Sequence, residues 1–115
     1  MLVVDDCRSW GQQVAAALGI AGWGVDWVAT LDSAVDRVTA ADHALVIVGM
    51  AIGRHRAADV AAALRSVRPS LRVAIAAREE SEEHWREAAL ARALPVPKSL
   101  PPDALRAVVA ACTER

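Results

Sequence analysis

The sequence predicts an α/β fold in which one parallel sheet of five strands is covered by helices on both faces. Apolar residues alternate, five times in succession, between the short continuous runs typical of strands and the spacing typical of helices. A strand followed by a helix, repeated in this way, requires parallel strands joined by right-handed crossovers. Ala44–Val48 is apolar at every position, as expected of a strand that is buried on both faces.

The five strand-like runs are short, and two of them end at residues that interrupt a strand. Leu2–Val4 stops at a pair of aspartates, and the central run stops at Gly49. β-Branched residues, which favour extended backbone, are frequent in these runs. The strands are expected at residues 2–4, 25–28, 44–48, 71–76 and 94–97.

Helical spacing follows each strand, with recognisable signals at the helix ends. Thr30 is expected to cap the second helix. Glu82 and Glu83 place negative charge in the first turn of the fourth helix, where the helix dipole favours it. Gly19 ends the first helix and Pro69 stops the third. The helices are expected at residues 8–18, 31–38, 57–67 and 81–90, and from 101 onward.

Two prolines predict that the last strand lies at the margin of the sheet. Pro95 and Pro97 have no backbone N–H, and residues two apart in a strand direct this group toward the same side. That side of the strand lacks donors and must be unpaired, whereas Val96 can pair on the other side. Proline in a strand belongs at an edge.

Length, charge and hydropathy exclude several classes of protein. The 115 residues suit a single domain spanning 1–115, with no linker and no output domain. A formal net charge of −1 gives no overall positive field for binding nucleic acid, and a hydrophobic content of 55% excludes disorder. No apolar run is long enough to cross a membrane. The two cysteines, Cys7 and Cys112, suit a reducing compartment, so we expect a cytoplasmic protein.

Candidate functional residues follow the predicted strands, at the sheet edge where open parallel sheets bind their ligands. Asp5 and Asp6 follow the first strand, and Gly49 follows the third. Ala76 ends the fourth strand, and Lys98 follows the fifth. Lys98 is the only lysine of a chain that otherwise uses arginine, which favours a specific role for a compact ammonium at this point.

These positions resemble the receiver domain of response regulators, and the resemblance covers the whole chain. It rests on the opening Leu-Val-Val-Asp-Asp, on the Gly22–Val25 entry to the second strand, and on Lys98 after the fifth. It implies a flavodoxin-like (βα)5 three-layer sandwich with strand order 2-1-3-4-5. It also implies a part in two-component or phosphorelay signalling.

The resemblance implies a chemistry for which this chain lacks the decisive residues. In receivers an aspartate at the end of the third strand accepts a phosphoryl group, and the acidic pair holds Mg²⁺. A threonine or serine ends the fourth strand, and an aromatic residue three positions before the lysine reorients. Gly49, Ala76 and Pro95 stand at these three positions here. Glycine cannot accept a phosphoryl group and alanine cannot donate a hydrogen bond, so no catalytic residue is expected.

The remaining polar residues, Asp5, Asp6 and Lys98, form what we call the acidic site. We expect Lys98 to pair with one of the two aspartates and to hold the site closed. Two carboxylates beside one ammonium carry less negative charge than three carboxylates would. Mg²⁺ binding by Asp5 and Asp6 is therefore expected to be weak or absent, and no other cofactor is expected.

The segment after the third strand carries Arg54, His55 and Arg56. One interpretation is a basic loop that folds over the acidic pair and takes the place of the metal. The other interpretation is a solvated loop, since exposed charges contribute little to stability.

The leading hypothesis is a receiver-like signalling module that has lost phosphorylation, has no enzyme activity, and acts by contact with other proteins. The resemblance implies a pairing face made of the fourth helix, the fifth strand and the fifth helix, through which a homodimer could form. No nucleic acid or membrane is expected as a partner. Trp85, among charged residues, is the tryptophan best suited to an interface.

Two alternatives remain open at this point. The small side chains at Gly49 and Ala76 could leave a cavity that binds a small anion or a metabolite, with Lys98 and the arginines of the loop as contacts. Alternatively, Asp5 or Asp6 could act as a displaced phosphoryl acceptor. The second alternative is disfavoured because neither residue lies on the third strand.

Overall fold

A parallel sheet of five strands forms the middle layer of the molecule. The structure is a computed structural model that describes residues 1–113. Its strands are β1 (Leu2–Val4), β2 (Asp26–Val28), β3 (Val46–Gly49), β6 (Val73–Ala77) and β7 (Leu94–Pro97). They pair in the order β2-β1-β3-β6-β7 and are parallel throughout. With the five strands counted along the chain, this is the predicted order 2-1-3-4-5, which is confirmed. The last two residues of the predicted domain, 114 and 115, lie outside the described residues.

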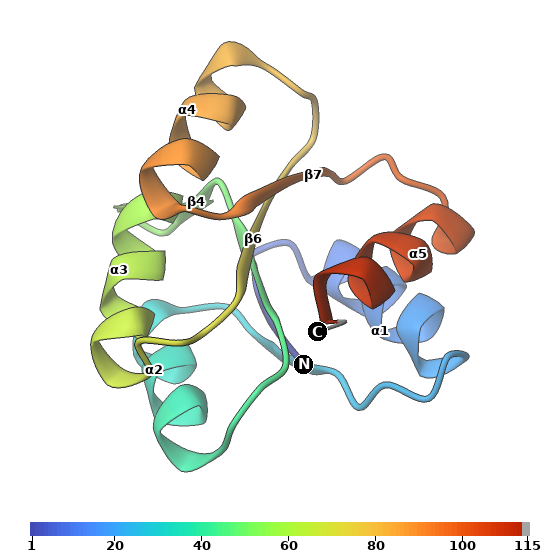
Figure 1. The fold of residues 1–115 in the computed structure, drawn as a ribbon, viewed down its shortest axis with the longest axis horizontal. Helices are drawn as coiled ribbons and strands as arrows, with labels where there is room; N and C mark the ends of the chain where they lie inside the picture. Colours follow the sequence, from blue (N-terminus) through green and yellow to red (C-terminus); the bar gives the residue numbers. More distant parts are fainter. Residues whose placement is uncertain (114–115) are drawn as a thin grey trace.

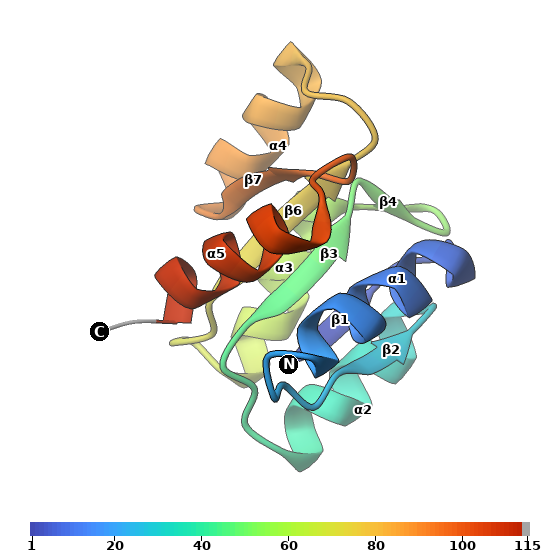
Figure 2. The same ribbon diagram turned by 90° about the vertical axis from the view of Figure 1, so that its right-hand side faces the viewer.

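Five helices cover the two faces of the sheet, as predicted. They are α1 (Arg8–Gly19), α2 (Leu31–Ala40), α3 (Ala57–Val67), α4 (Glu82–Ala91) and α5 (Pro102–Thr113). Figure 1 shows α2, α3 and α4 on one side of the sheet and α1 with α5 on the other, and the turned view in Figure 2 agrees. Thr30 caps α2 as predicted, since its hydroxyl accepts a hydrogen bond from the N–H of Ser33 at 3.2 Å.

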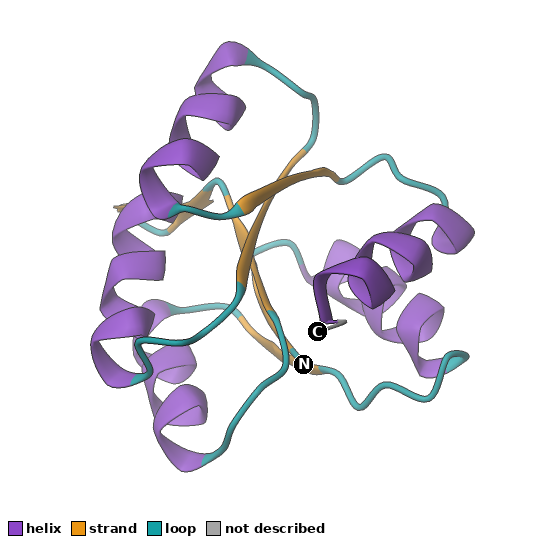
Figure 3. Cartoon of the chain, in the orientation of Figure 1, coloured by secondary structure: helices purple, strands orange, loops and turns teal. Residues whose placement is uncertain are grey.

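The core is divided by the sheet into two apolar layers. Every residue of β3 and of β6 is buried, because these central strands are covered on both faces. Figure 3 shows the strands enclosed between the two helical layers. Side chains that alternate along β1 enter opposite layers: Leu2 and Val4 pack toward α2 and α3, whereas Val3 packs toward α1 and α5.

β7 lies at the edge of the sheet, which confirms the prediction from its prolines. The N–H of Lys98 donates to the carbonyl of Ala77 at 2.7 Å, so Lys98 and the alternate residue Val96 direct their donors toward β6. Pro95 and Pro97 therefore present a donor-free outer edge to solvent.

A short hairpin follows β3 where the sequence predicted only a loop. Its strands are β4 (Ala51–Ile52) and β5 (His55–Arg56), which pair antiparallel through a turn at Gly53 with φ of +60°. A left-handed backbone of this kind favours glycine. Two-residue strands are too short to produce a periodic pattern in the sequence, which explains why the hairpin was missed.

None of the helices in residues 1–113 is both long enough and apolar enough to span a lipid bilayer.

Candidate functional site

The structure brings the predicted site residues to one edge of the sheet. Asp5 directly follows β1, Gly49 ends β3, and Lys98 follows β7. Gly49 and Ala76 are register partners on neighbouring strands, so the two smallest residues of the site lie side by side. Pro95 pairs in register with Ile75, one position back from the edge.

Asp5 is held in place by four contacts, two to its backbone and two to its side chain. Its N–H donates to the carbonyl of Val28 at 3.0 Å, and its carbonyl accepts from the indole Nε1 of Trp27 at 2.8 Å. Oδ1 of the carboxylate accepts from the N–H of Cys7 at 2.7 Å, and Oδ2 lies 2.6 Å from Nζ of Lys98. With only 1% of its surface exposed, Asp5 is a buried carboxylate with both oxygens engaged.

The Asp5 carboxylate occupies the space that a side chain at position 49 would need. A Cβ placed on Gly49 would lie 2.5 Å from Oδ2 and 3.1 Å from Cγ of Asp5, which is closer than van der Waals contact allows. The backbone at Gly49 is ordinary, because its φ is not in the left-handed region. Gly49 is therefore required by the proximity of Asp5, and the two residues together fill the site.

Lys98 links this carboxylate to α1. Its Nζ lies 4.8 Å from the ring centroid of Trp10, in the range of a cation–π contact, and 2.6 Å from Oδ2 of Asp5. The side chain is 18% exposed. Of the two aspartates that the sequence offered as partners, Lys98 contacts Asp5, whereas Asp6 is exposed.

The geometry does not suit Mg²⁺, which needs several oxygen ligands in an octahedral array. Oδ1 of Asp5 already accepts a hydrogen bond from a backbone N–H and Oδ2 is ion-paired with an ammonium, and Gly49 contributes no side-chain oxygen. Within residues 1–113, no group of three or more histidine, cysteine, aspartate or glutamate side chains is placed to hold a metal ion. Asp6, the other carboxylate of the acidic site, is exposed to solvent.

Of the two interpretations of the basic segment after β3, the structure agrees with the solvated loop, because Arg54, His55 and Arg56 are exposed and do not lie over the acidic pair. Arg56 forms an ion pair with Glu87 of α4. Arg54 and His55 are exposed and border a hollow of about 320 Å³, whose other wall includes Thr30 and Asp32 at the start of α2. The hairpin explains the difference, because it directs this segment toward the α2–α4 side of the sheet.

Two buried polar side chains on α4, which the sequence analysis did not single out, anchor this helix. His84 is fully buried, and its Nε2 lies 2.8 Å from the carbonyl of Ile75, to which it donates. Glu87 is also buried, and its Oε2 accepts from the N–H of Ala58 at 3.1 Å while Oε1 faces Arg56. The helical spacing of the sequence could have indicated their burial. Positions 84 and 87 share one face of α4 with Ala88 and Ala91, which is the face that packs against the sheet.

Cys7, at the mouth of the acidic site, differs from the second cysteine, Cys112 in α5. A hydrogen bond with the Ser9 hydroxyl, at 3.4 Å, and a second with the backbone N–H of Trp10 lower the pKa of the Cys7 thiol. Burial raises the pKa of the Cys112 thiol. Both cysteines are free.

The fold is that of known receiver domains. No protein-family model matches the sequence, and no curated protein matches it. Among solved structures, chemotaxis protein CheY4 of Vibrio cholerae is 23% identical with a TM-score of 0.86, over 96% of this chain and 95% of that one. A two-component response regulator from Clostridium difficile is 16% identical with a TM-score of 0.89, over 99% of this chain and 94% of that one.

A third solved structure, a response regulator from Thermotoga maritima, is 22% identical with a TM-score of 0.87, over 97% of this chain and 94% of that one. At these identities the likeness shows a shared fold. It confirms the predicted CheY-like, flavodoxin-like arrangement of strands and helices.

Proposed function

We propose that this chain is a receiver-like module of two-component signalling that works without phosphorylation, as a protein-binding domain of the cytoplasm with no enzyme activity. One observation carries the proposal: the Asp5 carboxylate fills the space beside Gly49 and is neutralised there by Lys98. A phosphoryl group or a metal ion would have to displace a buried, fully engaged carboxylate. The structural neighbours support the signalling class, since they are response-regulator receivers.

The anchoring of α4 supports a single, fixed conformation. Three side chains bond this helix to the rest of the molecule: His84 to the carbonyl of Ile75, Glu87 to the start of α3, and Arg65 of α3 to the carbonyls of Ala91 and Arg92. Because buried polar groups are costly to leave unpaired, a movement of α4 would break several contacts at once. The surface that α4 presents is therefore constant in this proposal.

The surface proposed for contact is the face formed by α4, β7 and α5. Leu90 on α4 is 66% exposed and Leu94 on β7 is 43% exposed, so this face offers apolar side chains to a partner. Pro95 and Pro97 remove the donors from the outer edge of β7, which prevents a partner from extending the sheet by strand pairing. A second copy of the chain would therefore pair through side chains.

Titration with beryllofluoride and Mg²⁺, followed in ¹H–¹⁵N correlation spectra, tests the phosphorylation-independent part. We expect the amide signals of Gly49, Ala76 and Lys98 to stay in place, because the acceptor position has no side-chain oxygen and the nearest carboxylate is buried. New signals for these three amides in slow exchange would contradict the proposal.

Sedimentation velocity at increasing concentration tests the proposed pairing face. The wild-type chain is expected to self-associate, and Leu90→Glu is expected to weaken association about tenfold or more, since a charge would be buried in the contact. Val67→Glu is the matched control, because Val67 is a partly exposed apolar residue on α3, outside this face. A chain that stays monomeric, or equal effects of the two variants, would reject this face.

The geometry disfavours both alternatives considered from the sequence, a ligand-binding cavity and a displaced phosphoryl acceptor. A ligand beside Gly49 would lie where Asp5 now sits, and Arg56 is engaged by Glu87 elsewhere. A displaced acceptor role for Asp5 would require its carboxylate to leave both Lys98 and the N–H of Cys7. Neither alternative is favoured by a specific observation.

A further inference from the structure

A hollow of about 240 Å³ lies at the edge of the sheet opposite the acidic site, where the strands begin and the helices end. Arg65 of α3 and Arg92, the residue after α4, line it together with Pro69, Ser70 and Leu71, which precede β6. Of the residues that the structure describes, no aspartate or glutamate is part of this lining. We call it the Arg65–Arg92 hollow, and its two guanidinium groups give it a positive charge.

Arg92 has a backbone conformation that is unusual for arginine. Its φ is +49° and its ψ is +51°, and it is the only residue other than glycine with a positive φ among residues 1–113. The end of α4 imposes this conformation, because the N–H of Ala93 donates to the carbonyl of Ala88 at 2.9 Å. Glycine adopts a left-handed backbone without steric cost and is usual at such a position. The end of the helix therefore explains the conformation but not the arginine.

The dipole of α4 does not explain Arg92 either, because Arg65 already occupies the negative end of this helix. The guanidinium of Arg65 donates to the carbonyls of Ala91 and Arg92, the latter at 3.1 Å, and its Nε donates to the carbonyl of Leu71 at 3.2 Å. A second guanidinium beside it is a repulsive neighbour. Burial and the charge of Arg92 together lower the pKa of Arg65. A strained backbone and a like-charge contact thus coincide at one hollow, which is typical of a functional site.

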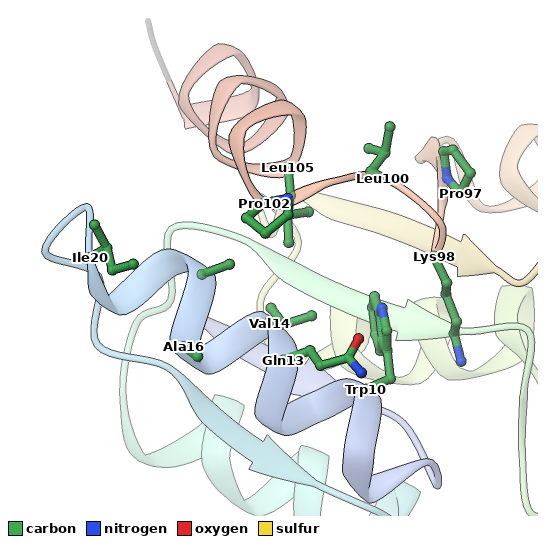
Figure 4. A pocket seen from close by; sticks show the side chains of 11 residues that line it. Trp10, Gln13, Val14, Ala16, Ile20, Pro97, Lys98, Leu100, Pro102 and Leu105 are labelled. Atoms are coloured by element: carbon green, nitrogen blue, oxygen red, sulfur yellow. The ribbon is translucent and has the colours of Figure 1, made fainter.

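The larger hollow between α1 and α5, of about 390 Å³, does not have this chemistry. Figure 4 shows that its lining is mostly apolar, with Lys98 as its one basic side chain. Lys98 is ion-paired with Asp5, whereas neither Arg65 nor Arg92 forms an ion pair with a carboxylate of residues 1–113. The smaller hollow is therefore the one whose charge calls for a ligand of opposite sign.

We propose that the Arg65–Arg92 hollow binds a phosphate group, either as the free ion or as part of a small phosphate ester. An anion between the two guanidinium groups replaces their repulsion with attraction. Arg65 has five N–H donors and uses three of them on carbonyls, so two remain for the anion, and Ser70 adds a hydroxyl. The guanidinium fork matches phosphate oxygens, and two positive charges suit a dianion better than a carboxylate.

The proposed site is separate from the acidic site, which lies at the carboxyl ends of the strands. Ser70 and Leu71 come before β6, and Arg92 comes before β7, whereas Lys98 follows β7. A phosphate held in the Arg65–Arg92 hollow would be bound by charge and hydrogen bonds and would not be transferred to the protein. The proposal therefore does not depend on the signalling role proposed above.

Titration of the full chain with sodium phosphate at constant ionic strength, followed in ¹H–¹⁵N correlation spectra, tests the proposal. The amides of Ser70, Leu71, Arg92 and Ala93 are expected to shift to saturation. Acetate, which has a single charge, is expected to bind about tenfold more weakly, the loss expected for one charge-assisted contact. Shifts that do not saturate, or that sodium chloride reproduces, would overturn the proposal.

Methyl phosphate distinguishes the two sources of the phosphate group. Binding within about tenfold of inorganic phosphate would show that the hollow admits an ester, and weaker binding would restrict it to the free ion. Both results support the site, and they differ only in the ligand that they assign to it.

Two arginine substitutions separate the function of the hollow from its part in the fold. Arg92→Gly suits the left-handed backbone, so this variant is expected to unfold at the wild-type temperature or above it and to bind phosphate at least tenfold more weakly. Arg78→Gln is the control, because Arg78 is exposed just after β6, at the opposite edge of the sheet, and phosphate binding is expected to stay unchanged. Wild-type phosphate affinity in Arg92→Gly, or equal weakening in the two variants, would reject the hollow.

Discussion

The helices on the two faces of the sheet are held in place by different kinds of contact. On the α2–α3–α4 face, polar side chains join one helix to the next, as the buried Glu87 and the partly buried Arg65 do between α3 and α4. On the α1–α5 face, the packing is largely apolar and leaves a groove of about 390 Å³. The polar contacts fix α4 in one place, whereas α1 and α5 are held mainly by apolar packing, with one hydrogen bond from Arg106 to the carbonyl of Ala17. The acidic site lies where the two faces meet, at the end of the sheet.

The largest effect is expected from removing the charge of Lys98. Lys98→Met leaves the buried Asp5 carboxylate without its counterion, which costs about 3–5 kcal/mol of unfolding free energy. The double variant Asp5→Asn/Lys98→Met removes both charges and is expected to recover most of that loss. Urea denaturation measures both values. A loss below about 1 kcal/mol for Lys98→Met would mean that the pair behaves as an exposed ion pair.

The contacts of α4 predict the next effect. Glu87→Leu leaves the N–H of Ala58 unpaired and frees Arg56, so we expect a loss of about 1–3 kcal/mol in urea denaturation. Glu83→Leu is the control, because Glu83 is exposed on the same helix and its change is expected to stay within about 0.5 kcal/mol. Equal losses of unfolding free energy for the two variants would show that the buried contacts of Glu87 do not anchor α4.

A methyl group at Gly49 tests whether Asp5 fills that space. Gly49→Ala forces the new Cβ against Oδ2 of Asp5, and overpacking of this kind costs about 1–3 kcal/mol. Gly24→Ala is the control, because nothing lies within 4 Å of a Cβ there and the φ is not in the left-handed region. A Gly49→Ala variant as stable as the Gly24→Ala variant would show that Asp5 moves away freely.

The smallest effect concerns the two thiols, which lie on the α1–α5 side of the molecule. Thiolate is the reactive form, so alkylation speeds up as the pH rises through the pKa of each thiol. The pKa is lowered for Cys7 and raised for Cys112, so the rate for Cys7 reaches half its maximum at the lower pH. Ser9→Ala is expected to move the Cys7 profile to higher pH. Iodoacetamide labelling with peptide mass spectrometry measures both profiles, and coincident midpoints would refute the assignment.

The order of strands and helices could be predicted because local patterns determine it. The apolar run before Gly49 predicts a buried strand, and the prolines of β7 predict an edge. The bounds of β3 and β6 differ from the predicted ones by one or two residues, since flanking apolar residues such as Leu45 and Leu71 are buried without being part of a strand.

The site was predictable in its residues but not in its arrangement. Strand order brings Lys98 near Asp5, and opposite charges at short range predict an ion pair. The position of the Asp5 carboxylate beside Gly49 depends on its side-chain rotamer and on the contacts with Trp27 and Cys7, which arise from the tertiary structure. The pairing of Arg56 with a residue of α4 depends on a hairpin that has no sequence period.

Intact-mass spectrometry after incubation with acetyl phosphate and Mg²⁺ shows whether the acidic site can be phosphorylated. We expect an unchanged mass, because position 49 has no side chain and the Asp5 carboxylate is buried against Lys98. A mass gain of one phosphoryl group, mapped to Asp5 or Asp6, would contradict it and would show that the acidic site opens to accept a phosphate.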